Sequence, residues 1–318
     1  MKNKIWLTIA LISIICGCSL FVISMSNIKW DFSKLDNTTY ITQTYEINDD
    51  FNNISIESTT SDIEILSSED ESKVEVYCNE NQENKVHVNN KDLLISTKQN
   101  KQFTKNISIT NKKPYIKIYL TKNIIENLTI NSSTGDVTLT KEFSFINVDI
   151  KLSTGDFTSY ANVKNNFNLK TTTGNVYIKN TISESLQVDI NSGKIVLEDL
   201  FIKNTITLAS STGKTYVSNV ECNTFYSTAN TGDININNLK VNDYMNVETT
   251  TGDIAFNDCL CQNINLTTSS GDVDGSLIGH MQIDAKSNSG KIEVDKDYQG
   301  GICQVRTTTG DIKITLKI

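Results

Sequence analysis

The chain is almost without proline and arginine: among 318 residues it has one proline, Pro114, and one arginine, Arg306. Histidine is nearly as scarce, since only His87 and His280 occur. The formal net charge is -8, and the lysines are scattered among aspartate and glutamate. Proteins that bind nucleic acid usually carry a clustered basic stripe. This composition therefore argues against nucleic acid as a partner and leaves little material for acid–base catalysis.

Glycine is sparse as well, yet ten of the 15 glycines recur every 19 or 20 residues. Ser or Thr precedes each of them, and Asp, Asn or Lys follows. A fixed period of this length is typical of repeat architectures. The ten positions are Gly135, Gly155, Gly174, Gly193, Gly213, Gly232, Gly252, Gly271, Gly290 and Gly310.

Apolar residues flank each glycine in alternation, as around Gly252, where Met245 and Val247 precede it and Ile254 and Phe256 follow it. The position seven residues before the glycine is apolar in all ten repeats. Alternation with period two is typical of strands with one buried face. A weaker apolar position seven or eight residues after the glycine indicates a third, shorter side to each coil.

The repeats predict an all-β fold, a single-stranded parallel β-solenoid (β-helix) with 19–20-residue coils. Glycine suits the corner between two strands because it accepts positive φ and close backbone approach. We expect the preceding Ser or Thr residues to stack and bond hydroxyl to hydroxyl. The nine steps between ten glycines would span about 43 Å. Leucine-rich repeats, propellers and sandwiches fit this period and motif less well.

Residues 5–25 are almost wholly apolar, follow Lys2 and Lys4, and are long enough to cross a bilayer as a helix. Trp6 and Trp30 flank the stretch as interfacial anchors would. We expect a single-pass cell-membrane protein, N-inside, with an extracytoplasmic C-terminal domain. An uncleaved anchor, lipidation at Cys18 and cleavage near Ser24–Ser26 all remain open, and each places the repeats outside the membrane.

Four parts are expected along the chain: a signal anchor or transmembrane helix (1–26), a juxtamembrane linker (27–40), an irregular β cap (41–125) and the regular solenoid (126–318). The cap section holds a degenerate motif, Thr60-Ser61-Asp62-Ile63, with Ser61 at the glycine position. We expect a hairpin insertion near residues 78–112. No cap is evident at the other end, where Lys313 and Lys317 would blunt the exposed edge.

The cysteines of the repeats are interpreted as small core residues, because Cys259 and Cys303 occupy positions that are otherwise apolar. Cys222 and Cys261 share a repeat position two coils apart, about 9.6 Å, which is too far for a disulfide. Cys259-x-Cys261 is not a usual zinc spacing, and no second pair exists. We expect neither a disulfide framework nor a bound metal or other cofactor.

The Asp residues that follow the glycines are the strongest candidate metal ligands, since Asp233, Asp253 and Asp272 would stack about 4.8 Å apart. Such a column could attract calcium, but turn residues that bond the local backbone are the simpler interpretation. The neighbouring Ser/Thr ladder resembles ice-binding faces, although the adjoining charges disfavour that use. No catalytic, cofactor-binding or metal-binding residue is therefore predicted.

The motif in Ser133-Thr134-Gly135-Asp136-Val137 and Thr250-Thr251-Gly252-Asp253-Ile254 resembles the "putative adhesin" family of bacterial β-solenoid envelope proteins. The resemblance runs from about Tyr40 to the end of the chain. It implies a non-enzymatic cell-envelope surface protein that binds an envelope or extracellular ligand, polysaccharide or protein. It implies no catalytic residues, because the family is largely of unknown function.

Two other function classes remain open. A self-associating envelope scaffold or a stress-response protein is the main alternative, because an uncapped terminal coil could stack end to end. A polysaccharide-active β-helix enzyme is the minor alternative. Such enzymes need clustered carboxylates and basic groups, which one arginine and two histidines supply poorly.

Overall fold

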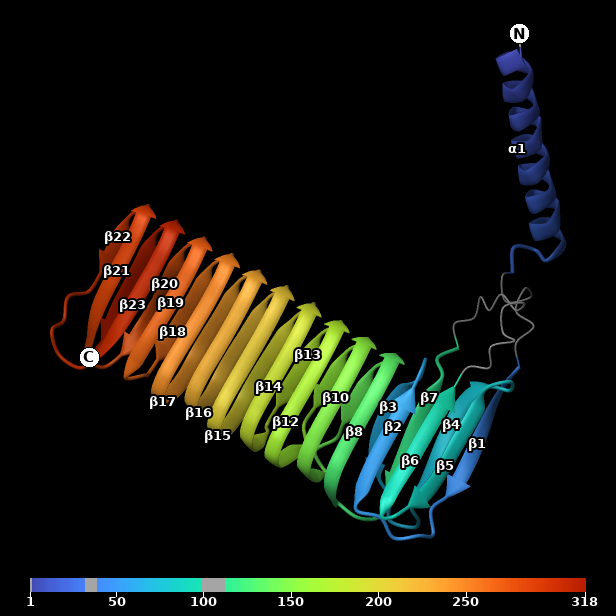
Figure 1. Ribbon diagram of the computed structural model, residues 1–318, viewed down its shortest axis with the longest axis horizontal. Coiled ribbons are helices and arrows are strands. Elements are labelled where there is room, and N and C mark those ends of the chain that lie inside the picture. The colour runs from blue at the N-terminus through green and yellow to red at the C-terminus, as the bar shows by residue number, and fades with distance from the viewer. Residues whose placement is uncertain (1, 32–38, 99–111) are drawn as a thin grey trace.

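The computed structural model describes residues 2–31, 39–98 and 112–318, with main chain alone for residues 2–5. One helix, α1 (Lys2–Asn27), stands apart from a long rod of strands (Figure 1). Its segment Trp6–Asn27 is long and apolar enough to cross a membrane. The apolar side chains of α1 are mostly exposed, with Trp6 at 69% and Leu7 at 74%. The helix therefore adds almost nothing to the core of the rod.

The rod is a parallel β-solenoid, as the repeats predict (Figure 1). Each coil has a long strand before the glycine and a shorter strand after it, and both pair in parallel with those of the neighbouring coils. The long strands are β8 (Ile124–Thr134), β10 (Ser144–Thr154), β12 (Asn162–Thr173), β14 (Ile182–Ser192), β19 (Asn263–Ser270), β21 (Met281–Ser289) and β23 (Gly301–Thr309). The short strands are β9 (Val137–Leu139), β11 (Phe157–Ser159), β13 (Val176–Lys179), β18 (Ile254–Cys259), β20 (Val273–Ile278), β22 (Ile292–Val294) and β24 (Ile312–Lys317).

In the middle of the rod, the short strand of one coil continues into the long strand of the next. Three strands have this form: β15 (Ile195–Thr212), β16 (Thr215–Thr231) and β17 (Ile234–Thr251). Their apolar side chains point inward in columns, and Phe225, Met245 and Val247 are fully buried. Burying one such side chain contributes about 1.5–3 kcal/mol. Stacking thus supplies the core that no single coil could form.

The glycine column is held by main-chain hydrogen bonds. The Gly193 N–H donates to the carbonyl of Thr212 at 3.0 Å, and the same bond repeats from coil to coil. A Cβ built on Gly213 would lie 1.6 Å from the Gly193 oxygen, at a φ of +146°. Only glycine fits here, as the sequence indicates. The expected hydroxyl-to-hydroxyl bonding of the preceding Ser and Thr is not among the contacts of the described residues.

The N-terminal end is closed by antiparallel strands. β1 (Tyr40–Glu46), β4 (Lys73–Asn79) and β7 (Tyr115–Leu120) form one antiparallel group. β5 (Glu83–Asn89) and β6 (Asp92–Lys98) form a hairpin, which lies in the region where the sequence predicts one. The rest of that predicted insertion, residues 99–111, lies outside the described residues, as do residues 32–38 of the predicted linker.

A coil from early in the chain lies inside this end of the rod. β2 (Asn53–Ser58) pairs with β6 and β8, and β3 (Asp62–Ser67) pairs with β7 and β9, all in parallel. A Cβ built on Gly135 would lie only 2.2 Å from the carbonyl oxygen of Ser61. This contact confirms Ser61 as the degenerate counterpart of the glycines. The coil is therefore enclosed between the cap and the first regular coil.

The C-terminal end departs from chain order. β23 pairs with β19 on one side and β21 on the other, and β24 lies between β20 and β22. The prediction that Lys313 and Lys317 blunt the exposed edge is therefore wrong, because β21 and β22 form that edge. The physical reason is apolar burial: Val305 and Ile312 in the inner segment are 0% exposed, whereas Ile292 in the outer one is 42% exposed.

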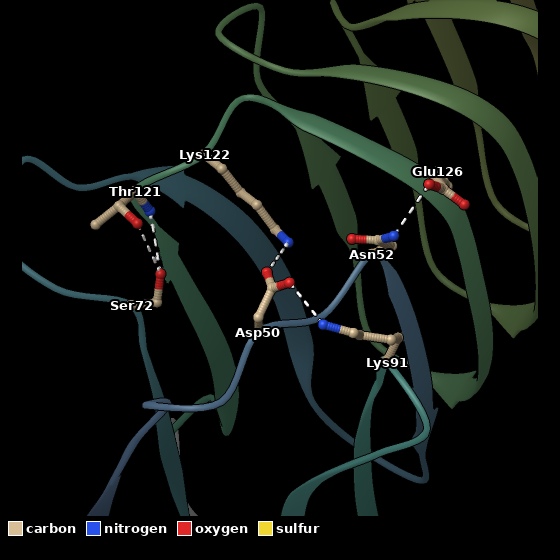
Figure 2. A network of polar contacts seen from close by, with 7 residues as sticks. All are labelled: Asp50, Asn52, Ser72, Lys91, Thr121, Lys122 and Glu126. Atoms are coloured by element: carbon tan, nitrogen blue, oxygen red, sulfur yellow. Dashed lines mark hydrogen bonds and ion pairs between the residues drawn. The ribbon is translucent and has the colours of Figure 1, made fainter.

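A polar network ties together the loops at the N-terminal end (Figure 2). The Asp50 carboxylate accepts a hydrogen bond from Lys91 Nζ at 2.8 Å and pairs with Lys122 Nζ at 3.6 Å. These lysines lower the pKa of Asp50, with the Lys91 hydrogen bond as the largest cause. Lys122 also lies over the Phe51 ring, 4.1 Å from its centroid. Asn52 bonds Glu126 and Ser72 bonds Thr121 in the same network.

Candidate functional site on the outer faces of the rod

The aspartates that follow the glycines form a ladder of carboxylates at the corner before the short strands. Asp136 Oδ1 accepts the main-chain N–H of Asp156 at 2.8 Å, and Asp253 Oδ1 accepts that of Asp272 at 2.8 Å. The expectation of local turn bonding is therefore wrong, because each carboxylate bonds the neighbouring coil. Within residues 2–31, 39–98 and 112–318, no group of three or more His, Cys, Asp or Glu side chains is arranged to hold a metal ion.

The ladder changes character in three successive coils, where Asn175, Lys194 and Lys214 replace aspartate. Asn175 Oδ1 still accepts the Lys194 N–H at 3.1 Å. A lysine side chain has no acceptor, so Lys194 and Lys214 cannot bond the next coil in this way. Lys214 instead pairs with Asp233 at 2.8 Å, which contributes to lowering the pKa of that carboxyl.

The same three coils carry an apolar row in the adjacent outward column. Tyr177 lies opposite Val196, which in turn lies opposite Tyr216. Lys194 Nζ lies over the Tyr216 ring, 5.5 Å from its centroid. We call Tyr177, Val196, Tyr216 and Lys194 the tyrosine–lysine strip. All four are half-buried, as expected on a flat sheet face where each side chain is flanked by its neighbours.

Most charged side chains beside the tyrosine–lysine strip form ion pairs. Lys179 forms an ion pair with Glu198 on the next coil, and this contact raises the pKa of the lysine. Tyr160, 39% exposed, lies one coil before Lys179 in the same column. The ammonium of Lys194 is the exception, because it forms no ion pair with any residue that the structure describes.

The long strands present a second outer face, rich in Asn, Thr and Ser. It carries a tyrosine pair, Tyr226 and Tyr244, whose ring centroids are 6.0 Å apart at an interplanar angle of 59°. Beside the pair, Asn265 Nδ2 donates to Asn246 Oδ1 at 2.6 Å. Burial raises the pKa of Tyr244. This face is polar and carries its aromatic rings in contact with each other.

The third side contains a ladder that sequence reasoning missed. Five residues six positions after successive glycines adopt a left-handed backbone with φ between 52° and 56°; they are Asn180, Asp199, Asn219, Asn238 and Asp258. Asn219 Nδ2 bonds Asp199 Oδ1 at 2.9 Å, and Asn238 bonds Asn219 at 3.0 Å. Asn and Asp are the residues that best tolerate this conformation. Their regular offset from the glycines was the available signal. A shallow groove of about 620 Å³ runs beside them, past Ile182 and Phe201.

The few residues considered for catalysis are not brought together. Arg306 pairs with Asp284, and His280 Nδ1 bonds Asp297 Oδ2 at 2.7 Å, an interaction that lowers the pKa of Asp297. His87 lies in β5, at the opposite end of the rod (Figure 1). Cys261 lines a groove next to His280, but burial raises the pKa of its thiol. A thiol in that state is a poor nucleophile.

The cysteines of the rod carry free thiols. They are buried in the core, as the sequence predicts for Cys259 and Cys303. Cys222 lies opposite Val241, so Cys261 is a further coil away. Burial raises the pKa of Cys222, Cys259 and Cys303 to about 12. These thiols therefore pack as small hydrophobic side chains.

The sequence matches the family model described as Toastrack DUF4097 over residues 51–212 and 202–318. These matches cover most of the chain, which therefore belongs to this family of unknown function. No curated protein matches the chain.

The solved structures that match this chain share little sequence with it. A "putative adhesin" from Bacteroides fragilis is 15% identical, over 88% of this chain and 97% of that chain, with a TM-score of 0.42. A "putative lipid binding protein" from Parabacteroides distasonis is 14% identical, over 88% and 98%, with a TM-score of 0.45. At these scores neither carries an argument about the function of this chain.

Proposed function

We propose that this protein is a non-enzymatic binding protein of the cell envelope, anchored by α1, with its rod outside the cytoplasm. The observation that carries the proposal is the in-register parallel stacking from β2 to β21, which repeats outward side chains in rigid columns. A ligand that is itself a repeating polymer can contact several coils at once. Weak contacts then add up, because each further contact forms at a high effective concentration.

The proposed orientation follows from charge. Lys2 and Lys4 precede the apolar segment, and positively charged flanks favour the cytoplasmic side. Protease added to intact spheroplasts should then digest the rod, whereas a cytoplasmic marker should survive. Survival of the rod until the membrane is ruptured would contradict this orientation. Mass spectrometry of the N-terminal peptide would distinguish a retained anchor, a lipid on Cys18 and a cleaved signal.

Binding is tested with the full chain in lipid nanodiscs. We expect it to sediment with isolated cell-wall polymers, and empty nanodiscs provide the control. Binding should persist when exposed surface lysines far from the strip, such as Lys85, are changed to Gln. If wall polymers, glycan arrays and envelope proteins all fail to retain the chain, the proposed binding function is wrong.

Self-association is a second candidate because of the C-terminal edge. Among the strands of the described residues, β21 pairs only with β23, and β22 only with β24, so the outer side of this coil has main-chain groups that no described strand pairs. Ile292 on this coil is 42% exposed. Analytical ultracentrifugation of the nanodisc-free chain in detergent should then show concentration-dependent dimers. A single monomeric species across the accessible concentration range would reject this candidate.

A further inference from the structure

We propose that the tyrosine–lysine strip is a binding subsite for an extended, acidic β-1,4-linked glycan. This inference rests on the binding function proposed above and names its ligand class and its location. The strip consists of Tyr177, Val196 and Tyr216, on the outer face of β13, β15 and β16, and of Lys194 at the corner before β15.

Two columns of the rod change together at the tyrosine–lysine strip. Elsewhere along most of the rod, the residue after the glycine is an aspartate that bonds the next coil. In the coils of Tyr177, Val196 and Tyr216 it is Asn or Lys. A lysine at this position cannot accept the main-chain N–H of the next coil as aspartate does. Stability alone therefore does not favour the replacement of aspartate by lysine. Departures from a local structural rule tend to occur at functional sites.

The spacing of the two tyrosines matches a β-1,4-linked glycan. Tyr177 and Tyr216 are two coil steps apart in one column, about 9.6 Å. In an extended β-1,4-linked glycan, alternate sugars present the same face, and the disaccharide repeat is close to this length. The two tyrosine rings could therefore contact the apolar faces of two sugars that are one disaccharide repeat apart. Val196 then lies beneath the sugar between them. An α-1,4-linked chain curls and cannot keep this alignment.

The charge of the strip suits an acidic ligand. Lys179 and Lys214 are paired with Glu198 and Asp233. Lys194, in contact with the Tyr216 ring, has no carboxylate partner among the described residues. Its ammonium is positioned to accept a sugar carboxylate as its counterion.

The tyrosine pair on the other face lacks these features. Tyr226 and Tyr244 contact each other at 6.0 Å, closer than two coil steps, and their rings are tilted by 59°. Two carboxylates, Asp243 and Glu248, lie on the same strand as Tyr244, and Glu248 accepts a hydrogen bond from Asn246. An acidic chain would be repelled there. This pair therefore serves as a matched control of two tyrosines on the same rod.

The test measures binding of three hexasaccharides to the full chain in nanodiscs by isothermal titration calorimetry. The β-1,4-linked glucuronic acid hexamer and cellohexaose differ only in the carboxylate, and maltohexaose differs from cellohexaose in the linkage. We expect the acidic hexamer to bind most tightly, cellohexaose more weakly and maltohexaose not measurably. The Tyr177→Ala/Tyr216→Ala double variant should weaken the acidic hexamer at least about tenfold.

Two further variants make the test specific. Lys194→Gln should remove the preference for the acidic hexamer over cellohexaose and keep cellohexaose binding. Tyr226→Ala/Tyr244→Ala should leave both affinities within about twofold. Unfolding midpoints of all variants show whether each one is folded, and only folded variants are compared.

The outcomes separate this inference from the general binding function. If wall polymers retain the chain but no β-1,4-linked hexamer binds, or if Tyr226→Ala/Tyr244→Ala is the damaging change, the strip is not the site and the binding function stands. If maltohexaose binds as well as cellohexaose, the spacing argument is wrong. If wall polymers, glycan arrays, envelope proteins and the hexamers all fail to bind, both proposals fail.

Discussion

The main-chain N–H of Gly271 donates to the carbonyl oxygen of Thr309 at 2.9 Å, and not to Ser289, its counterpart in the next coil along the chain. The Gly310 N–H then donates to Ser289 at 3.1 Å. The final segment of the chain is therefore enclosed, and the segment before it forms the end of the rod. This order determines which substitutions near the C-terminus destabilise the protein.

Ile312 and Ile292 hold the same repeat position, but they are 0% and 42% exposed. We expect Ile312→Ala to lower the free energy of unfolding by about 2–4 kcal/mol, because it leaves a cavity in the core. Ile292→Ala should cost less than about 1 kcal/mol. Urea unfolding followed by circular dichroism measures both. Equal costs, or a larger cost at Ile292, would show that the coils stack in chain order.

Gly213 lies at the closest approach of two coils, where a Cβ would be 1.6 Å from the Gly193 oxygen. Gly213→Ala must push the coils apart or strain the backbone, so we expect a loss of about 2–4 kcal/mol. Gly279→Ala is the control, because its φ is +91° but nothing lies within 4 Å of the added carbon. That change should cost about 1 kcal/mol. The thermal unfolding midpoints of the two variants should differ accordingly.

Asp233 links two coils through Lys214 and the main-chain N–H of Asp253. The Lys214 hydrogen bond is the largest cause that holds the pKa of Asp233 below its ordinary value. A lowered folded-state pKa adds stability above the unfolded-state pKa of about 4, and this stability is lost as the pH falls through the folded-state value. Asp233→Asn should therefore be less stable than wild type at neutral pH, by at most about 1 kcal/mol because the pair is partly exposed.

This difference between wild type and Asp233→Asn should shrink as the pH falls below about 4. Urea unfolding at a series of pH values measures it. Lys214→Gln removes the main partner of the carboxylate. The free energy of unfolding of this variant should therefore fall less than that of wild type as the pH falls below about 4. A difference that stays constant down to about pH 2 would mean that ionisation of Asp233 contributes nothing to stability.

Ser227 occupies a core position that is apolar in neighbouring coils, as at Leu208 and Val247. It is 1% exposed, and its hydroxyl has no hydrogen-bond partner among the described residues. An unsatisfied buried hydroxyl is costly, so Ser227→Ala should raise the free energy of unfolding by about 1 kcal/mol. Chemical denaturation can detect this gain. A loss of stability would show that the hydroxyl bonds a group that the contacts do not reveal.

The regular part of the fold follows from local rules that the sequence displays directly. The glycine period predicts the coils, and the alternating apolar residues predict which side chains are buried, as at Phe225 and Met245. The chain order at the C-terminus could not be predicted, because Gly290 and Gly310 carry the same motif and either segment could pair with β19. The difference in burial between the two segments depends on which of them lies against β19, and that pairing is set only in the folded structure.

The candidate site was only partly visible in the sequence. In the sequence, Lys194 and Lys214 appear only as two of the positions where lysine follows the glycine. Their relation to Tyr177 and Tyr216 depends on which residues of adjacent coils lie side by side. The left-handed Asn and Asp ladder could have been found from its constant offset to the glycines, since five successive coils carry it.

The sequence by itself determined the period, the strand faces, the glycine corners and the apolar helix, because each depends on residues close together in the chain. Only the tertiary structure decided which coil stands beside which, and therefore which segment closes each end. It also decided that each aspartate bonds the next coil and that Lys194 lies over Tyr216. These contacts join residues about one coil apart or more, and they form only once stacking has buried the apolar columns.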